Sequence, residues 1–487
     1  MVVANGISKT QPEVGFPSRS TALLERIYQS HQHVDEEQDS IHQPQVKLRV
    51  LVVGAGLGGL ATAVALTRQG NEVTVLEQAA ALGEVGAGIQ IPPNSARLLL
   101  KWGIGPYLEQ YAIKPESMTF RRWENGEPIG YTKLDSDFAE TYGAPYFVIH
   151  RADFHRALQS LAAKHGVEVI TSSRVTDYDD TIPSALTSDG RQYTADLIVA
   201  ADGVKSRARP VVLGGQDPPP QRTGFAAYRA VVYTKDMKDD NDTSWLLERP
   251  GINIWIGQDR HVMTYCIAGG DSFNMVLSHI DHSLPSTWNA ANALQEMRQS
   301  FRDWDPRPAI STPTWFQLAN YCYRLVSLIN KIKQTVKRPL VTGARLPTWI
   351  SKSEKLLILG DAAHAMVPYM SQGAAMAVED GAALATSLSK IRCKEDAPDA
   401  LRAFQHERMS RSYGMQAASL VNGRIWHFPD GPLQQARDLG MKAEVEGRPF
   451  VESTNQWSDP MTQLWAYGYD AERAMEEYWG SGKVTCS

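Results

Sequence analysis

The sequence predicts an α/β protein: a discontinuous domain with a parallel sheet, an inserted and mostly antiparallel β domain, and a helical C-terminal region. Three observations support this prediction. A strand–helix–strand pattern with a glycine-rich turn occupies residues 47–77, two similar apolar strands occur only much later, and segments that alternate apolar and polar residues lie between them. Strands of one sheet that are interrupted in this way indicate an inserted domain.

The first strand–helix–strand unit begins at Lys47. Val50–Val53 is a short apolar run with β-branched residues, which is typical of a strand buried on both faces. Ala61–Arg68 has the composition of a helix that Gly70 ends, and Glu72–Glu77 is the second strand. Two strands joined by a helix within about 30 residues predict a parallel sheet.

Three glycines between the first strand and the helix form the pattern of a phosphate-binding turn. Gly54 permits a tight turn, Gly56 lets the backbone approach a pyrophosphate, and Gly59 allows close helix–strand packing. Glu77 ends the second strand, where its carboxylate can accept hydrogen bonds from a free adenosine ribose. The pattern predicts a Rossmann-like site for an adenine dinucleotide. The alternative is a tight turn followed by a surface glutamate.

Two later strands end in short turns that carry one aspartate each. Leu197–Ala200 precedes Asp202, and Leu356–Leu359 precedes Asp361. Asp361 is placed to bind a ribityl hydroxyl, and a helix beginning near Gly373 would stabilise negative charge on a reduced flavin ring. These turns favour FAD over NAD. The alternative for Asp361 is a helix cap.

The middle of the chain predicts a second layer. Thr223–Tyr233 and Gly251–Leu277 alternate apolar and polar residues, as antiparallel strands do. Pro308–Tyr323 has no charged residue and breaks the pattern, so we interpret it as an atypical insertion or a gene-model artefact; Leu325–Val336 then keeps helical spacing. The predicted parts are residues 1–46 (disordered extension), 47–120 with 150–215 and 350–390 (FAD-binding domain), 216–349 (substrate domain) and 391–487 (C-terminal helical region).

Composition excludes several classes of protein. A net charge of −5 over 487 residues, without basic runs interleaved with aromatics, argues against nucleic-acid binding. The four cysteines lack metal-ligand spacing, so we expect no metal site. No apolar run reaches the roughly 20 residues that span a bilayer, and the N-terminal stretch lacks the apolar core of a signal peptide. We therefore expect a cytoplasmic protein without a transmembrane segment.

The motifs, in this order, resemble the three fingerprints of single-component FAD-dependent aromatic hydroxylases, the group A flavin monooxygenases with the p-hydroxybenzoate hydroxylase fold. Within this family the sequence is similar to the fungal salicylate-hydroxylase-like group. The resemblance runs from near Lys47 to near Asp438. The matching segments are Gly54–Gly59 with Glu77, Glu84–Asn94, His150–Asp153, Ala201–Arg209, Gly360–Pro368, Pro368–Ala383 and Trp426–Gly431.

The resemblance implies a monooxygenase that binds FAD, is reduced by NADH or NADPH, and has no second Rossmann domain. Reduced FAD in such enzymes captures O₂ as a C4a-hydroperoxide, which hydroxylates a phenolic or other electron-rich aromatic substrate. A role in fungal specialised metabolism and assembly as a homodimer are further expectations. Epoxidation, Baeyer–Villiger oxidation and salicylate-type decarboxylating hydroxylation stay open as alternatives. An NAD-dependent dehydrogenase or a non-catalytic flavin-binding protein explains fewer of the motifs.

The resemblance also assigns cofactor contacts. It implies that Glu77 and Arg151 contact the adenosine or pyrophosphate side of FAD, and that Asp202 supports both FAD and the nicotinamide cofactor. The alternative for Arg151 is a salt-bridged residue before a helix. We expect Pro368–Met370 near the ring-side pocket. The residues implied to surround the ribityl chain and the isoalloxazine ring are Ala87, Gly88, Ile89, Asp361, Gly373 and Ala374.

For the chemical step we favour Arg229 and Tyr265, which lie on predicted strands of the second layer. In fungal dearomatising relatives, an arginine and a tyrosine at matching places hold the phenolate. A guanidinium can stabilise and orient a phenolate, and a phenol hydroxyl adds a second anchor. Tyr228 competes with Tyr265, because strand alternation leaves open which of them faces the pocket. The alternatives are a surface ion pair for Arg229 and a core position for Tyr265.

Overall fold

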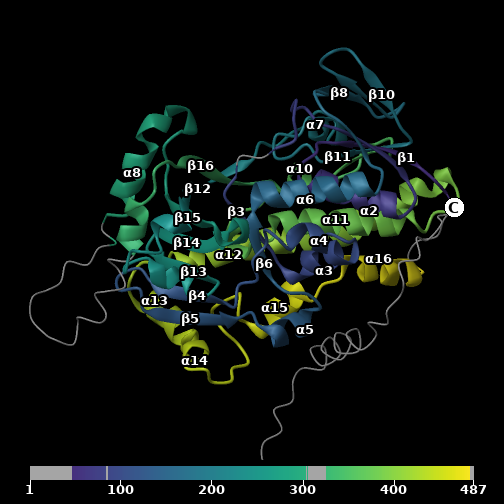
Figure 1. Ribbon diagram of the computed structural model, residues 1–487. Coiled ribbons are helices and arrows are strands. Elements are labelled where there is room, and N and C mark those ends of the chain that lie inside the picture. The colour runs from purple at the N-terminus through teal and green to yellow at the C-terminus, as the bar shows by residue number, and fades with distance from the viewer. Residues whose placement is uncertain (1–45, 84–85, 303, 305–324, 483–487) are drawn as a thin grey trace, which may run out of the picture. The chain divides into compact units, whose positions relative to one another are not determined.

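The computed structural model describes residues 46–83, 86–302, 304 and 325–482, and Figure 1 shows how its elements are arranged. The N-terminal extension up to residue 45 and the atypical segment Pro308–Tyr323 lie outside the described residues. The predicted helix over Leu325–Val336 is wrong in its second half, because helix covers residues 325–330 and Val336 opens a strand. Thr335 and Val336 are β-branched, which favours the extended backbone of that strand.

A parallel sheet of five strands forms the first layer, in the order β17-β11-β1-β2-β7. Every neighbouring pair in it runs parallel, which confirms the predicted parallel sheet. The order also brings β17 beside β11, as expected for one domain that an insertion interrupts. The strands are β1 (Arg49–Val53), β2 (Glu72–Leu76), β7 (Glu168–Ile170), β11 (Leu197–Ala200) and β17 (Leu356–Ile358).

Two helices pack side by side next to this sheet, and the first of them also contacts β1 and β2 (Figure 1). Helix α2 (Leu57–Arg68) starts at Leu57 rather than Ala61, because it continues directly from its N-cap Gly56. Helix α11 (Gly373–Leu388) begins at the predicted Gly373. The two helices touch through backbone, since a Cβ added at Gly381 would lie 2.8 Å from Thr62 Cα. This contact joins the two helices near their midpoints.

A sheet of seven strands forms the second layer, in the order β16-β12-β15-β14-β13-β4-β5. The central pairs are antiparallel, as predicted. Two strands from an earlier part of the chain also join it. The predicted FAD-binding range includes residues 117–120, yet β4 pairs with β13. The strands are β4 (Ser117–Arg122), β5 (Pro128–Lys133), β12 (Gln221–Tyr233), β13 (Gly251–Gly257), β14 (Arg260–Ile267), β15 (Ser272–Ile280) and β16 (Val336–Thr342).

A short two-stranded ladder connects the layers. Strand β3 (Gly88–Ile91) pairs with β6 (Phe147–His150). The Gly88 N–H donates to Asn274 Oδ1 on β15 at 2.7 Å, so β3 is fixed against the seven-stranded sheet. The smaller elements are β8 (Val175–Asp179), β9 (Ser184–Thr187), β10 (Gln192–Thr194), α3 (Pro93–Lys101), α4 (Gly105–Leu108), α5 (Ser136–Tyr142), α6 (Arg151–Lys164), α7 (Ala208–Val212), α8 (Ala293–Ser300), α10 (Asp361–His364) and the 3₁₀ turn η7 (Pro368–Met370).

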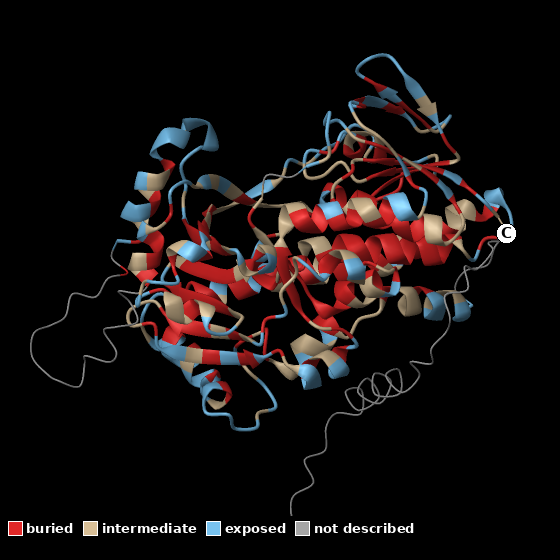
Figure 2. Ribbon diagram, in the orientation of Figure 1, coloured by how far each residue is buried: buried red, intermediate tan, exposed pale blue. Residues whose placement is uncertain are grey.

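The C-terminal region is helical, as predicted. Its longest element, α12 (Ala397–Trp426), runs along α11 and reaches the second layer at Trp426. Buried residues make up most of α2 and α11 and recur in both sheets, whereas most residues of α13 are exposed (Figure 2). The other C-terminal helices are α13 (Pro432–Gly440), α14 (Lys442–Val445), α15 (Pro460–Tyr467) and α16 (Ala471–Gly480).

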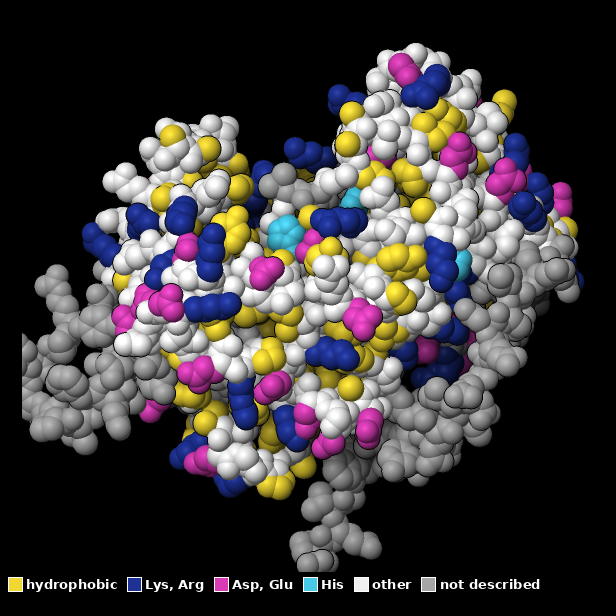
Figure 3. Space-filling view, viewed as in Figure 1, with side chains coloured by type: hydrophobic (Ala, Val, Ile, Leu, Met, Phe, Trp, Pro, Cys, Tyr) yellow, Lys and Arg dark blue, Asp and Glu magenta, His cyan; other side chains and the backbone are white. Residues whose placement is uncertain are grey.

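Two further features concern the surface charge and the apolar character of the helices. Basic and acidic side chains are interspersed on the face that Figure 3 shows. None of the described helices combines the length and apolar character that a bilayer crossing requires.

Candidate active site

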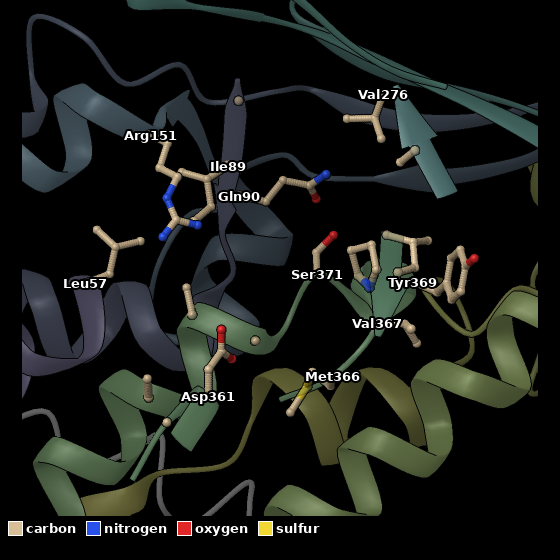
Figure 4. A pocket seen from close by; sticks show the side chains of 18 of the residues that line it. Leu57, Ile89, Gln90, Arg151, Val276, Asp361, Met366, Val367, Tyr369 and Ser371 are labelled. Atoms are coloured by element: carbon tan, nitrogen blue, oxygen red, sulfur yellow. The ribbon is translucent and has the colours of Figure 1, made fainter. Parts of the chain in front are cut away.

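A cavity of about 330 Å³ lies between α2, α11 and the seven-stranded sheet, a volume typical of small-molecule sites. Figure 4 shows Leu57 and Arg151 on one side of it and Val367 and Tyr369 on the other. It therefore brings together segments from both layers and from the C-terminal helix. The predicted site residues that line it are Gly56, Gly88, Ile89, Arg151, Arg229, Tyr265, Asp361, Gly373 and Ala374.

The glycine turn has the geometry that its three glycines predict. Gly54 has a φ of +102°, and a Cβ there would lie 2.6 Å from Ala201 O. A Cβ at Gly59 would lie 1.9 Å from Gly54 O, so any larger residue would separate the helix from the turn. Gly56 differs, because a Cβ there would meet nothing within 4 Å. Its backbone lines the cavity as an open cradle.

Glu77 lies beside this turn, outside the cavity wall. Its Oε2 accepts a hydrogen bond from the Ala55 N–H and its Oε1 accepts one from the Ala79 N–H, each at 2.8 Å. The carboxylate is thus held at the carboxyl end of β2, next to the first phosphate-facing residue. A ribose contact for Glu77 stays a prediction.

Asp202 does not line the cavity, although its neighbours Ala201 and Gly203 do. Its Oδ2 accepts from the Arg207 N–H at 2.7 Å and from the Tyr178 hydroxyl at 3.4 Å. Its Oδ1 is buried and has no hydrogen-bond partner in the described part of the chain. The aspartate therefore orders the turn that follows β11, and its predicted cofactor contacts are untested.

Ala87 also lies behind the wall, where its carbonyl accepts from the Arg151 N–H at 3.1 Å. This bond joins the residue before β3 to the first residue of α6. Arg151 itself lines the cavity on the side of Leu57 (Figure 4). Ala87 and Arg151, which were predicted to contact different parts of FAD, are thus joined by a backbone hydrogen bond, and their cofactor contacts stay predictions.

The opposite wall contains the second aspartate turn. Gly360 has a φ of +60°, which suits glycine, and Asp361 follows it at the cavity surface. The Gly360 N–H donates to Asp380 Oδ2 at 3.0 Å, and His364 Nε2 lies 2.6 Å from the same oxygen. His364 is fully buried. His364 therefore lies in the core and is not part of the cavity wall.

The N-terminal end of α11 faces the cavity through Gly373 and Ala374. A helix of 16 residues carries a partial positive charge at this end, which favours negative charge on a bound ring. Together with the open backbone at Gly56 and the carboxylate of Glu77, these features fit an extended dinucleotide. The residues present therefore fit FAD, and a place for its phosphates at α2 and for its ring at α11 stays a prediction.

The sheet wall of the cavity places Arg229 and Tyr265 on one face. Arg229 on β12 pairs with Val276 on β15, which pairs with Met263 on β14. Tyr265 lies two residues beyond Met263 and so points to the same side. Tyr228 has the opposite parity and stacks on His279, with ring centroids 4.7 Å apart. Strand alternation therefore places the Tyr228 side chain on the face of the sheet opposite the cavity.

Arg229 and Tyr265 influence each other electrostatically. Burial lowers the pKa of Arg229, and the nearby Tyr265 opposes this shift. Burial raises the pKa of Tyr265, and Arg229 opposes that shift in turn. Arg229 Nε is buried without a hydrogen-bond partner among the described residues. A buried guanidinium with an unused donor is suited to bind an anionic oxygen.

Sequence reasoning missed His261, a cavity residue four positions before Tyr265 on β14. The period-two alternation that selects Tyr265 also selects His261, so the signal was present. The partner of His261 is His427, which follows α12; His261 Nδ1 lies 2.9 Å from His427 Nε2. No sequence pattern predicts this contact. Gln90 was also missed; it accepts from the Tyr146 hydroxyl at 2.5 Å and lines the cavity.

Comparisons with known proteins identify the family of this chain. The sequence matches the family described as "FAD binding domain" over residues 47–313 and 336–419. It is 34% identical over 435 residues to "FAD-dependent monooxygenase OpS4" of Beauveria bassiana, covering 89% of this chain and 96% of that protein. This chain belongs to the FAD-dependent monooxygenases. The family match leaves out residues 314–335, which overlap the atypical segment, and the interpretation of that segment stays a prediction.

Further comparisons support the aromatic branch of this family and the fold. The monooxygenase is 31% identical over 432 residues to "3-hydroxybenzoate 6-hydroxylase" of Klebsiella oxytoca, covering 88% of this chain and 98% of that one. The crystal structure of FqzB is similar with a TM-score of 0.72 and 24% identity, covering 91% and 95% of the two chains. The predicted family, the fold class and the FAD cofactor are confirmed.

Proposed function

We propose that this FAD-dependent aromatic monooxygenase hydroxylates a phenolic substrate held as its phenolate, with NADH or NADPH as the reductant. The observation that carries the proposal is the pairing of Arg229 and Tyr265 on the cavity wall, with Arg229 Nε buried and without a described partner. When bound, FAD accepts electrons from the nicotinamide and activates O₂ for transfer to the aromatic ring.

The residues of the chain orient and activate the substrate. The Arg229 guanidinium stabilises the phenolate, which makes the ring carbons more electron-rich. Tyr265, whose raised pKa keeps it protonated, donates a second hydrogen bond to the same oxygen. Met263, Val276 and Leu340 surround this anchor with apolar surface that excludes water from the reacting atoms.

Three finer expectations accompany this proposal. A role in fungal specialised metabolism rests on the resemblance to the salicylate-hydroxylase-like group. A cytoplasmic location rests on the sequence composition. Assembly as a homodimer is testable by the mass of the native enzyme in solution.

Substitution of Arg229 tests the proposed anchor. Arg229→Ala should keep its FAD and lower phenol-dependent turnover by about 10- to 150-fold, because a charged hydrogen bond worth about 1.5–3 kcal/mol is lost. Product formation and bound flavin are both measured. Arg222→Ala, on the same strand but exposed, is the matched control and should behave as wild type. Loss of FAD from Arg229→Ala, or unchanged turnover, would contradict the assignment.

A further inference from the structure

The cavity has a second polar end, which the proposed anchor does not use. We propose that His261, Tyr369 and Trp426 form a distal subsite for a second, uncharged hydrogen-bonding group of the aromatic substrate, such as a ketone or a hydroxyl. This inference rests on the proposed function, because it assumes that the phenolate oxygen lies at Arg229 and Tyr265.

The strand geometry separates the two ends. Tyr265 and His261 are four residues apart on β14 and both line the cavity. At the rise of a β-strand their Cα atoms lie about 13 Å apart. Met263 lies between them on the same face and presents apolar surface to the ring. A ring anchored at Tyr265 therefore directs its far substituent toward His261.

The distal subsite is enclosed by aromatic rings. The His261 ring makes edge contacts with Tyr369 and Trp426, at centroid distances of 5.5 and 5.2 Å. Both rings belong to segments fixed by α12, since Asn422 Nδ2 donates to the Tyr369 carbonyl at 2.7 Å and Trp426 is the last residue of the helix. His261, Tyr369 and Trp426 are each less than 5% exposed. The walls of the subsite are thus fixed and enclosed.

Two polar atoms in this enclosure have unused hydrogen-bonding capacity. The Tyr369 hydroxyl is buried and makes no hydrogen bond to a residue that the structure describes. The Ser278 hydroxyl beside it also lacks a described partner and opposes the rise in the pKa of Tyr369 that burial causes. His261 uses Nδ1 for His427, and no described residue bonds its Nε2. Buried polar atoms of this kind cost free energy unless a ligand or water satisfies them. A purely apolar substituent would leave them unsatisfied.

The charges around the subsite exclude a carboxylate. Burial and the neighbouring His427 hold the pKa of His261 well below its usual range, and burial lowers the pKa of His427 to about 3. The pair is therefore neutral at physiological pH. Arg437, behind His427, is paired with Asp438 at 2.7 Å. A carboxylate here would lose its hydration without gaining a facing cation.

The charged groups that line the cavity lie elsewhere. They are Arg151, Arg229 and Asp361. Figure 4 shows Arg151 and Asp361 across the cavity from Tyr369. Arg229 is assigned to the phenolate. Charge recognition thus belongs to the cofactor end and the anchor, and neutral recognition to the distal subsite.

The two tautomers of the pair His261–His427 allow His261 Nε2 either to donate a hydrogen bond to the ligand or to accept one from it. When the His427 Nε2–H donates to His261 Nδ1, the proton of His261 is on Nε2 and can be donated to a carbonyl. In the reverse tautomer His261 Nε2 accepts from a hydroxyl. The tyrosine hydroxyl can fill the complementary role. Ketones and hydroxyls therefore satisfy the same subsite.

Calorimetric titration of the FAD-loaded enzyme, without NAD(P)H, tests the subsite with three para-substituted phenols. The probes are 4-hydroxyacetophenone, its apolar analogue 4-isopropylphenol, and 4-hydroxybenzoate. We expect the ketone to bind about tenfold more tightly than either of the others, the equivalent of one hydrogen bond or one avoided desolvation. Equal affinities, or tighter binding of the carboxylate, would overturn the subsite and leave the proposed function intact.

Variants distinguish a ligand contact from a structural effect. Tyr369→Phe and His261→Phe should each weaken binding of the ketone about three- to tenfold and leave binding of 4-isopropylphenol unchanged. Tyr142→Phe is the control, because this buried tyrosine donates to Gln463 and does not line the cavity. Equal losses for the ketone and the apolar analogue would overturn the subsite. If none of the phenols binds wild type, the proposed function fails and the subsite with it.

Discussion

At the scale of single residues, glycines shape the backbone of the site and charged side chains are placed to contact the cofactor and the substrate. Glycines are required where backbone approaches backbone, as at Gly54 and Gly59, and where the cavity needs open backbone, as at Gly56. Charged side chains occupy both parts of the site: Glu77 beside the glycine turn, where a ribose contact is predicted, and Arg229 on the sheet wall, where a phenolate is proposed.

Removal of the Glu77 carboxylate should weaken FAD binding. Glu77→Ala loses the proposed ribose contact and the two backbone hydrogen bonds that order the turn, so we expect FAD to bind about 10- to 150-fold more weakly. Flavin fluorescence during titration of the apoprotein measures this. Glu72→Ala, an exposed glutamate at the start of β2, is the control. A Glu77→Ala protein that purifies with full flavin and wild-type affinity would place the ribose acid elsewhere.

At the scale of elements, a buried ion cluster joins α11 to α12. Arg408 donates to Glu379 Oε2 at 2.6 Å and to Asp380 Oδ1 at 2.9 Å, and Arg411 bonds Glu379 as well. Asp380 also accepts from the Gly360 N–H, so the cluster supports the turn that carries Asp361. The two helices and the cofactor turn are thereby one electrostatic unit.

Breaking this cluster should destabilise the fold. Arg408→Ala removes the guanidinium that bonds both buried carboxylates and leaves Arg411 on Glu379 and His364 on Asp380, so we expect a loss of about 3–5 kcal/mol in the free energy of unfolding. Chemical denaturation measures the loss. Arg402→Ala, an exposed α12 arginine that pairs with Glu354 and Asp399, should change stability by less than about 1 kcal/mol. A small effect of Arg408→Ala would show that the cluster contributes little.

The same cluster sets a pH dependence of stability. Desolvation raises the pKa of Glu379 and Asp380, but their cations outweigh it, so both values lie below their ordinary 4.5 and 3.8. Groups with depressed native pKa values stabilise the fold above their unfolded values, and this stabilisation is lost as the pH falls below them. Acid unfolding should therefore begin below about pH 4.5. In Arg408→Ala it should begin at higher pH.

At the scale of the whole molecule, the C-terminal helix completes the substrate cavity. Gly423 of α12 packs against the Tyr369 ring, where an added Cβ would lie 2.6 Å from ring atoms. The helix contributes Trp426 to the wall and is followed by His427, the partner of His261. Residues more than 300 positions from the glycine turn thus shape the site that serves the same cofactor.

Gly423→Ala should disturb the distal end of the cavity from outside it. The added methyl group forces Tyr369 to move, at a cost of about 1–3 kcal/mol in stability. Binding of a phenol that contacts Tyr369 should weaken, while the FAD content stays normal. Gly480→Ala, at the end of α16 with no atom near its added Cβ, is the control. Wild-type stability and phenol binding in Gly423→Ala would contradict this packing account.

Local sequence patterns predicted the parts of the fold that local physics determines. The glycine turn, the strand ends at Asp202 and Asp361, and the helix start at Gly373 follow from short-range rules, and all lie within or beside the cavity. Long-range pairing was not predictable in this way. No short sequence pattern predicts that β4 pairs with β13 or that His427 contacts His261, because both contacts form between segments that are far apart in the sequence.

Isotope labelling tests the central claim most directly. The purified yellow protein is supplied with NADH or NADPH and phenols under ¹⁸O₂, and each product is weighed by mass spectrometry. The account predicts one ¹⁸O atom in a hydroxylated phenol, with turnover that depends on Arg229. Oxygen derived from water would contradict it, and so would nicotinamide consumption that never yields an oxygenated phenol.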